Sequence, residues 1–398
     1  TPRKSSSTVP MASKKFQDVE VLAPMVRGST LPLRLECLRY GASLVWGEEI
    51  IDRKLIGAVR LENSPFGCID YVSPKEKVSV FSTCAEETKK VIFQLGTASA
   101  SLAVQAAQVV CNDVSGIDIN MGCPKSFSVK GGMGAALLDK PEAVAEILKA
   151  LRRELPSDKS VTCKIRMLPS TEKTRDFMQV CEKSGAEAIT VHMRLREERP
   201  AEPAHWDEIS RLWDAVQVPV LANGDFFSRH QIDEFWKHCD AKGCRPSGIM
   251  IARGALWNPS IFSTKPPSFE EMVKSYVRSA VATNSTYQNT KWVLSQILAG
   301  GTGVTVPTTF NGINMKTFNR ELSACKSMAQ ICSNFAEPFV AAEYPTRAHT
   351  TVFYKDFTFQ DESKEPLKRA LETPVEATPC AKMQRLEVKI NDLDGESV

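Results

Sequence analysis

The amino-acid sequence predicts an α/β protein, a (β/α)₈ TIM barrel followed by a small all-α domain. Between residues 19 and 254, eight short apolar runs alternate with helix-like stretches. Most of these runs lack strict apolar–polar alternation, as expected for parallel strands that are covered on both faces. A doubly wound sheet is the competing fold, but it would need a topological break and normally uses fewer strands. The pattern therefore favours the barrel.

The predicted elements follow one another in a regular order. Amphipathic segments lie between several of the strands, for example residues 141–155, whose apolar side chains recur at helical spacing. Residues 64–81 are rich in turn formers and predict a hairpin inserted over the barrel mouth. The eight predicted strands occupy residues 19–23, 43–46, 91–94, 116–120, 160–165, 188–192, 219–222 and 248–251.

The pattern changes after residue 266, where three apolar stripes at helical spacing predict a small helical domain. The first 15 residues are Ser-rich and basic and predict a flexible leader, in which Met11 could be the native start. The last part of the chain is charged and interspersed with proline, with weak strand character at residues 350–354, and we expect it to be mostly disordered. The expected division is 1–15 leader, 16–265 barrel, 266–342 helical domain and 343–398 tail.

Composition excludes several classes of protein. The 398 residues include 50 Lys and Arg against 47 Asp and Glu, which excludes a globally basic binder but permits a local basic face. No apolar run approaches the ~18 residues of a membrane-spanning helix, so we expect no membrane contact. The 12 cysteines form no Cys-x-x-Cys pair and accompany no secretory leader, which indicates reduced thiols, no metal site and a cytoplasmic location. We expect a monomer.

Residues 117–138 are the most informative segment of the chain. Residues 117–120 alternate as a short strand does, and Cys123 follows at once. Pro124 fixes the start of the next loop, and a glycine-rich turn lets backbone approach a ligand before a helix begins near Ala135. A thiol at a rigid strand end, beside an amide, is suited to donating or accepting one proton.

Most of the predicted strands end in polar or small residues. Active sites of this fold lie at the carboxyl ends of its strands. The Gln94 amide both donates and accepts hydrogen bonds, and Lys164 needs a negative partner because an isolated buried charge is costly. Loops after the last two strands are the usual phosphate cradle of the fold. This pattern predicts flavin mononucleotide (FMN) at the barrel mouth. The candidate residues at these positions are Pro24, Met25, Val26, Gln94, Lys164, His192, Asn223, Gly224, Asp225, Ala252 and Arg253, and the family resemblance carried by the Cys123 motif implies that they bind FMN.

The Asn-x-Gly-Cys-Pro motif at residues 120–124 resembles the active-site signature of the tRNA-dihydrouridine synthases, flavoenzymes that reduce uridine in tRNA. The resemblance covers roughly residues 23–342, and residues 194–200 and 257–262 are similar to the eukaryotic branch that modifies position 20 of the D-loop. The family usually has glycine where this chain has Met193, which we expect to narrow the site or alter the approach of the base. Vertebrate relatives add a double-stranded-RNA-binding domain, for which residues 345–398 lack room.

The resemblance implies a reaction in which NADPH is the reductant, FMN passes a hydride to uracil C6, and Cys123 is the general acid that protonates C5. A thiol near its ordinary pKa of about 8.5 stays protonated at neutral pH. The expected contacts to the tRNA are Asn120, Arg166, then Arg194, Arg196 and Arg199 on the sixth loop, and further phosphate contacts from Lys125, Lys130, Lys316 and Arg320.

The sequence leaves two alternative functions open. A flavin barrel acting on a free pyrimidine, similar to dihydroorotate dehydrogenase, would share the cofactor end but would not need a helical domain. A non-catalytic tRNA-binding protein could use the same fold, although the presence of Cys123, Lys164 and Arg253 speaks against it.

Overall fold

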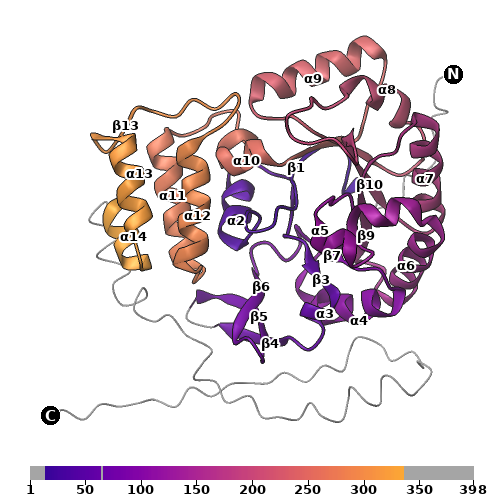
Figure 1. Ribbon diagram of the computed structural model, residues 1–398, viewed down its shortest axis with the longest axis horizontal. Helices are drawn as coiled ribbons and strands as arrows, with labels where there is room; N and C mark the ends of the chain where they lie inside the picture. Colours follow the sequence, from indigo (N-terminus) through magenta and orange to yellow (C-terminus); the bar gives the residue numbers. More distant parts are fainter. Residues whose placement is uncertain (1–13, 64–65, 336–398) are drawn as a thin grey trace.

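A computed structural model describes residues 14–63 and 66–335. Its main sheet runs in the order β2-β1-β12-β11-β10-β9-β8-β7, and the pairing of β2 with β7 closes it into a parallel barrel (Figure 1). The barrel strands are β1 (Val19–Leu22), β2 (Leu44–Trp46), β7 (Val91–Gly96), β8 (Gly116–Met121), β9 (Ser160–Met167), β10 (Ala188–Leu195), β11 (Val220–Asn223) and β12 (Gly248–Ile251). Each coincides with a predicted strand, and the (β/α)₈ prediction is confirmed. A short strand, β3 (Ile50–Ile51), extends the sheet beside β7.

Helices cover the outside of the barrel, as a parallel sheet requires. Ser99, Ser170 and Ser228 each cap the helix that follows by accepting a backbone N–H, so these helices begin where the sequence places a cap. The α-helices around the barrel are α2 (Leu31–Arg39), α3 (Asp52–Leu55), α4 (Ala100–Val110), α5 (Ser126–Lys130), α6 (Pro141–Glu154), α7 (Thr171–Lys183), α8 (Ile209–Leu212), α9 (Arg229–Lys242) and α10 (Arg253–Trp257). Short 3₁₀ helices are η2 (Cys111–Asp113), η3 (Gly134–Asp139), η4 (Trp206–Glu208) and η5 (Pro259–Phe262).

Alternation along the strands divides the core into two layers. Val21, Trp46, Ile92 and Met250 belong to one buried cluster, which fills the barrel interior. Their strand neighbours, such as Phe93, belong to a second cluster shared with the helices. Residues two positions apart on one strand therefore face the same layer, and this rule decides which side chains reach the barrel mouth.

The insertion between β3 and β7 is a three-stranded antiparallel sheet of β4 (Val59–Asn63), β5 (Cys68–Ser73) and β6 (Val78–Cys84). The predicted hairpin is present as β5 and β6, but its expected place over the barrel mouth was wrong. Phe81 packs edge-on against the outward-facing Phe93, and the Tyr71 hydroxyl donates to Asp113, which precedes the amino end of β8. The apolar face of the sheet thus covers the barrel flank rather than its carboxyl-terminal opening.

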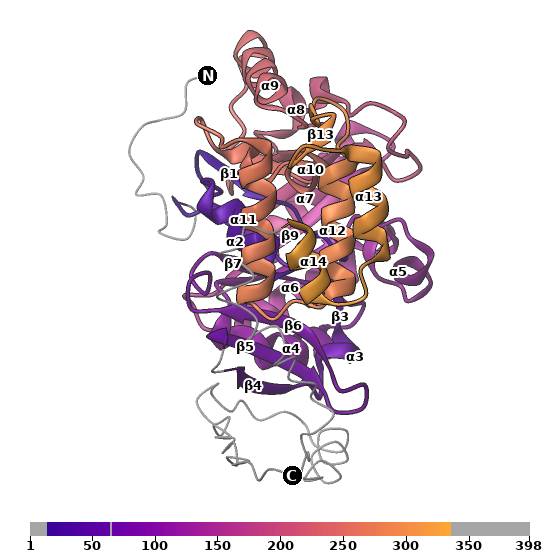
Figure 2. The ribbon, with the colours of Figure 1, turned by 90° about the vertical axis from the view of Figure 1, so that its left-hand side faces the viewer.

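The helical region consists of α11 (Phe269–Ala282), α12 (Tyr287–Ala299), α13 (Met315–Ala324) and α14 (Met328–Phe335), with a small hairpin of β13 (Thr309–Phe310) and β14 (Ile313–Asn314). Its helices stand together beside α2 and α10 (Figures 1 and 2). Phe310, Phe318 and Phe335 form its aromatic core. The hairpin and α13 were not predicted, because their apolar residues are sparse.

Both ends of the chain lie partly outside the described residues. The structure does not describe residues 1–13 of the expected leader, residues 336–342 of the expected helical domain or the 343–398 tail. The limits of the domains therefore stay predictions. Lys15, the last residue of the expected leader, lies within the described residues. Its Nζ donates to the Ser115 carbonyl at 2.9 Å, and burial lowers its pKa to about 8. Within residues 14–63 and 66–335, the helices lack the length and apolarity that crossing a membrane would require.

Candidate active site

The inward rows of four adjacent strands, β8 to β11, carry polar side chains towards the carboxyl end of the barrel. Asn120 on β8 is in register with Lys164 on β9, and Arg166 on β9 is in register with His192 on β10. His192 is in turn in register with Asn223 on β11. Five residues expected in the site from the sequence therefore lie at the same end of the interior.

The alternation of side chains along β10 corrects two of the expectations drawn from the sequence. Met193 is fully buried in the cluster between strands and helices, so it faces away from the interior and cannot narrow the site as expected. Arg194 lies in the inward row of β10 and its side chain is 3% exposed, so it is not the surface contact of the sixth loop that we expected. A residue one position from an inward side chain points to the opposite layer.

Arg194 instead joins an ion-pair cluster around Asp225. Both oxygens of the Asp225 carboxylate accept hydrogen bonds from Arg194 Nη2 at 2.6 Å, and Oδ1 also accepts one from Arg253 at 3.0 Å. The backbone N–H of Ala204 donates to Oδ2 at 2.7 Å. Asp225 has a positive φ of 59°, so the chain turns sharply after β11 to place this carboxylate. The carboxylate is positioned to orient the two arginines.

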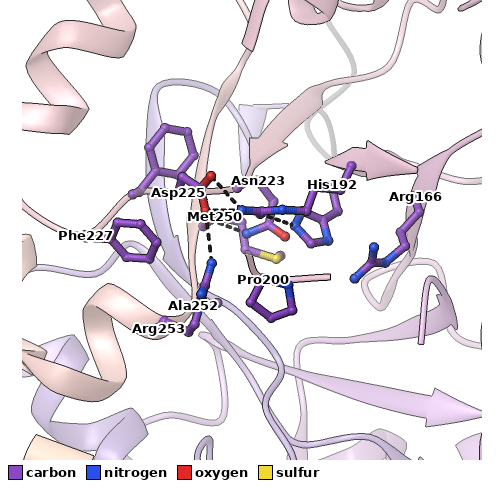
Figure 3. Close-up of a pocket in the computed structure, with 12 residues that line it drawn as sticks. Arg166, His192, Pro200, Asn223, Asp225, Phe227, Met250, Ala252 and Arg253 are labelled. Atoms are coloured by element: carbon purple, nitrogen blue, oxygen red, sulfur yellow. Dashed lines mark hydrogen bonds and ion pairs between the residues drawn. The ribbon is translucent and has the colours of Figure 1, made fainter. Parts of the chain in front are cut away.

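These groups line a cavity at the mouth of the barrel (Figure 3). Basic side chains reach it from several strands, and burial together with Lys164, Arg166, Arg194 and Arg253 lowers the pKa of His192 well below its ordinary value. Burial and Arg194 also lower the pKa of Arg166. This excess of positive charge favours an anionic ligand. The lining residues are Arg166, His192, Arg194, Pro200, Asn223, Gly224, Asp225, Phe226, Phe227, Met250, Ala252 and Arg253.

Lys164 lies deeper in the interior. Burial and the nearby Arg166 lower its pKa to about 8. Within the described part of the chain, its ammonium group forms no hydrogen bond and no ion pair within 4 Å. The Asp118 carboxylate opposes this decrease, and burial raises the pKa of Asp118 to about 6. A lysine in this environment is suited to a negatively charged ligand edge.

The Asp118 carboxylate also holds the side chain of Gln94 in place. Its Nε2 donates to Asp118 Oδ2 at 2.8 Å, while Thr162 donates to Oδ1 at 2.7 Å. Because the amide nitrogen is engaged, Gln94 can offer its carbonyl oxygen to a ligand N–H. The role of Asp118 was missed in the sequence, where it reads only as part of a strand; its inward position two residues before Asn120 could have revealed it.

The loop after β8 presents the thiol. Asn120 Oδ1 accepts the backbone N–H groups of Gly122 at 2.9 Å and Cys123 at 3.0 Å, which ties the loop to the strand end. Among the described cysteines, Cys123 is the one that is not buried. Burial and the neighbouring Glu49 raise the pKa of its thiol, which is therefore protonated at neutral pH. The chain then forms α5 and η3, so the helix expected near Ala135 is a short 3₁₀ helix.

The Glu49 carboxylate lies beside the Cys123 thiol, and the sequence did not predict it as a site residue. Glu49 follows β2, and its Oε1 accepts a hydrogen bond from Ser128 at 3.2 Å. Burial raises the pKa of Glu49. No local motif marks this residue, because its contact with the Cys123 loop joins segments that are far apart in the sequence.

The remaining expected residues occupy the rim or the surface. Ser29 ties the turn at Pro24, Met25 and Val26 to β1, because its hydroxyl accepts from the Met25 N–H and donates to the Ala23 carbonyl, both at 2.7 Å. Arg196, Arg199, Lys125, Lys130, Lys316 and Arg320 are at least partly exposed. Within the described residues, no group of three or more His, Cys, Asp and Glu is arranged to bind a metal ion.

Comparison with known proteins agrees with this geometry. Residues 21–343 match the family described as Dihydrouridine synthase (Dus), and the chain belongs to this family. It is 40% identical over 301 residues to the tRNA-dihydrouridine(20) synthase [NAD(P)+] of Schizosaccharomyces pombe, covering 73% of this chain and 61% of that protein. It is 39% identical over 301 residues to the Saccharomyces cerevisiae protein of the same name, covering 70% of this chain and 77% of that protein. The chain thus spans under two thirds of the length of the first relative.

Proposed function

We infer that the protein reduces a D-loop uridine of tRNA, at position 20, to 5,6-dihydrouridine with FMN as cofactor and NADPH as reductant. The observation that carries this conclusion is the thiol of Cys123 after β8, the partly exposed one among the cysteines that the structure describes, beside an interior lined by cationic side chains. Membership of the Dus family and the printed names of the two yeast relatives support the choice of substrate. The free thiols of the described cysteines support a cytoplasmic location.

The residues present fit FMN. The guanidinium groups of Arg194 and Arg253, oriented by Asp225, would bind the phosphate together with backbone N–H groups after β11 and β12. The carbonyl of Gln94 would accept from the pyrimidine edge, and Lys164 would compensate the negative charge at that edge. FMN bound in this way supplies the hydride for uracil C6, at the expense of NADPH.

The chain's own contribution to the reaction is a proton. Cys123 Sγ donates it to C5 of the uracil, since its raised pKa keeps the thiol protonated. Asn120 fixes the backbone that carries this thiol. Arg166 donates to the carbonyl groups of Leu195 and Glu198 at 2.8 Å and 3.1 Å, which places its remaining donors beside the cavity for the base.

The uracil of a folded tRNA must leave its stack to reach an interior site of this kind. Phosphate contacts then orient the RNA without reading its sequence. Arg196 and Arg199 on the loop after β10, and Lys316 and Arg320 on α13, are the exposed basic residues to which we assign such contacts. We assign no contact to a tRNA phosphate to Arg194, because Asp225 and the barrel interior surround it.

The decisive experiment incubates the purified protein with NADPH and unmodified tRNA, followed by nucleoside mass analysis. We expect a yellow protein and dihydrouridine at position 20, and no product from a tRNA that carries cytidine there. Reduction of free uracil without activity on tRNA would instead indicate a free-pyrimidine enzyme. A colourless protein that binds tRNA would indicate a binding protein without catalysis.

A further inference from the structure

The carboxylate of Glu49 has one engaged oxygen and one free oxygen. Oε1 accepts the Ser128 hydroxyl at 3.2 Å. Oε2 is buried, and it has no hydrogen-bond partner among residues 14–63 and 66–335. A buried acceptor without a partner is unfavourable, so a nearby donor is expected to use it. The donors that interact with this carboxylate besides Ser128 are the Cys123 thiol and the Asn120 amide.

The backbone around Glu49 is shaped to keep these groups together. Gly134 has a positive φ of 58°, and a Cβ there would overlap Ser128 Oγ and lie 2.7 Å from the Cys123 carbonyl oxygen. A Cβ at Gly96 would lie 2.8 Å from Glu49 Oε1. Both glycines therefore permit close approach of Glu49, which follows β2, to Ser128 and Cys123, which follow β8.

Charges of both signs face the Cys123 thiol. The Glu49 carboxylate disfavours the thiolate, whereas Lys125 from the same loop, and Lys164 and Arg166 from β9, favour it. Cations close to a thiol favour its thiolate form, whereas burial and a neighbouring carboxylate oppose it. Burial and Glu49 together outweigh the cations, and they raise the pKa of the thiol above its usual value.

We propose that Glu49 is a positioning residue for the general acid: its free Oε2 accepts the hydrogen bond of the Cys123 thiol, and its negative charge keeps that thiol protonated. The inference rests on the proposed role of Cys123 in uridine reduction. During turnover the S–H bond breaks as a C5–H bond forms, and the thiolate left behind recovers its proton from water. The carboxylate beside it favours this recovery over persistence of a nucleophilic thiolate.

The test follows alkylation of Cys123 by iodoacetamide across neutral and alkaline pH, with peptide mass analysis to isolate this cysteine. Glu49→Gln keeps the shape and the contact with Ser128 but removes the charge. We expect the midpoint of its profile to fall by about one pH unit, which is roughly tenfold faster alkylation at neutral pH. Glu49→Asp, which keeps the charge, should stay closer to the wild-type profile than Glu49→Gln.

Glu48→Gln is the matched control. Glu48 is adjacent in sequence, but its Oε2 accepts the Arg27 backbone N–H at 2.7 Å, so this change should leave the Cys123 profile unaltered. An unchanged midpoint in Glu49→Gln, or an equal shift in Glu48→Gln, overturns the proposal. If Glu49→Gln does not fold, the wild-type protein is compared with a peptide of residues 117–130, and a protein midpoint at or below that of the peptide also overturns it.

The measurement separates this proposal from the proposed function. Alkylation requires neither tRNA nor NADPH, so it reports on the pairing of Glu49 and Cys123 whatever the substrate is. Failure to form dihydrouridine from tRNA would refute the function and leave the alkylation result intact.

Discussion

A serine at position 123 would keep the size of the side chain but replace the thiol with a far weaker acid. General acid catalysis contributes about 10²–10⁴-fold to a rate. We expect Cys123→Ser to bind flavin with the wild-type absorbance spectrum and to form dihydrouridine slower by about that factor. The measurement is nucleoside mass analysis of tRNA after single-turnover incubation.

Cys325→Ser is the control for this substitution. Cys325 Sγ donates to the Glu321 carbonyl at the end of α13, a contact that a hydroxyl can reproduce. Its activity should match the wild-type value. Equal rates for Cys123→Ser and the wild-type protein would show that another group delivers the proton.

Lys164 gives the proposed cofactor site a pH dependence. Its pKa is lowered to about 8, so the lysine carries a charge below this pH and loses it as the pH rises. A negative ligand edge prefers the charged form, and the affinity of the apoprotein for FMN should therefore fall above about pH 8. Fluorescence titration with FMN measures this, with a slope of up to about tenfold per pH unit.

Lys164→Met should bind FMN weakly and without this pH dependence. Lys159→Met is a suitable comparison, because Lys159 lies at the opposite end of the barrel and donates to the Val114 carbonyl at 3.0 Å. It should retain the wild-type pH profile of FMN affinity. A wild-type profile in Lys164→Met would remove this lysine from the cofactor site.

The sequence predicted those site residues whose position follows from strand alternation alone. Lys164 and Arg166 are two residues apart on β9, and both face the interior as expected. Met193 and Arg194 lie where the pairing of β10 with β9 shifts register after His192, so the directions of their side chains do not follow from local periodicity. Glu49 could not be found in this way, because its importance depends on a contact between β2 and the loop after β8.

At the level of secondary-structure elements, Asp225 links the ends of three strands. Its carboxylate binds Arg194 from β10 and Arg253 after β12, while it follows β11 itself. Removing one partner of a buried ion pair leaves the other charge uncompensated, which typically costs about 3–5 kcal/mol. The cluster therefore contributes to the stability of the barrel as well as to the cavity.

We expect Asp225→Asn to lower the free energy of unfolding by about 3 kcal/mol, near the lower end of that range. Asparagine tolerates the positive φ at this position, so the loss reports on charge rather than backbone strain. Urea denaturation is the measurement. Asp214→Asn breaks the exposed pair with Arg175 and should cost no more than about 1 kcal/mol. Similar losses in the two variants would contradict the role given to Asp225.

The inserted sheet shows where prediction of elements reaches its limit. Turn-forming residues between β4 and β6 indicated antiparallel strands, and the structure contains them. Their position on the flank depends on the packing of Phe81 against Phe93 and on the bond from Tyr71 to Asp113. Neither contact follows from local periodicity, because both join residues that are distant in the sequence.

For the molecule as a whole, the contact between barrel and helical region passes through α2 and α11. Glu36 on α2 is fully buried and accepts a hydrogen bond from the Ser279 hydroxyl on α11. Arg39 donates to both Glu36 and Ser275, the latter at 2.7 Å. Tyr276 is fully buried at the same junction. Polar and apolar groups across this contact tie the two parts together.

This junction predicts that the barrel and the helical region unfold as one cooperative unit. Glu36→Ala removes the shared acceptor and should cost roughly 2 kcal/mol. If the two parts are coupled, amide hydrogen exchange will show α2 and α11 losing protection by the same free energy, and the loss will extend to β1 and α12. Glu234→Ala on the exposed face of α9, where Glu234 pairs with His230, should leave both helices as protected as in the wild-type protein. Loss confined to α11 would mean that the helical region opens independently of the barrel, since a cooperative unit cannot lose stability on one side of its interface alone.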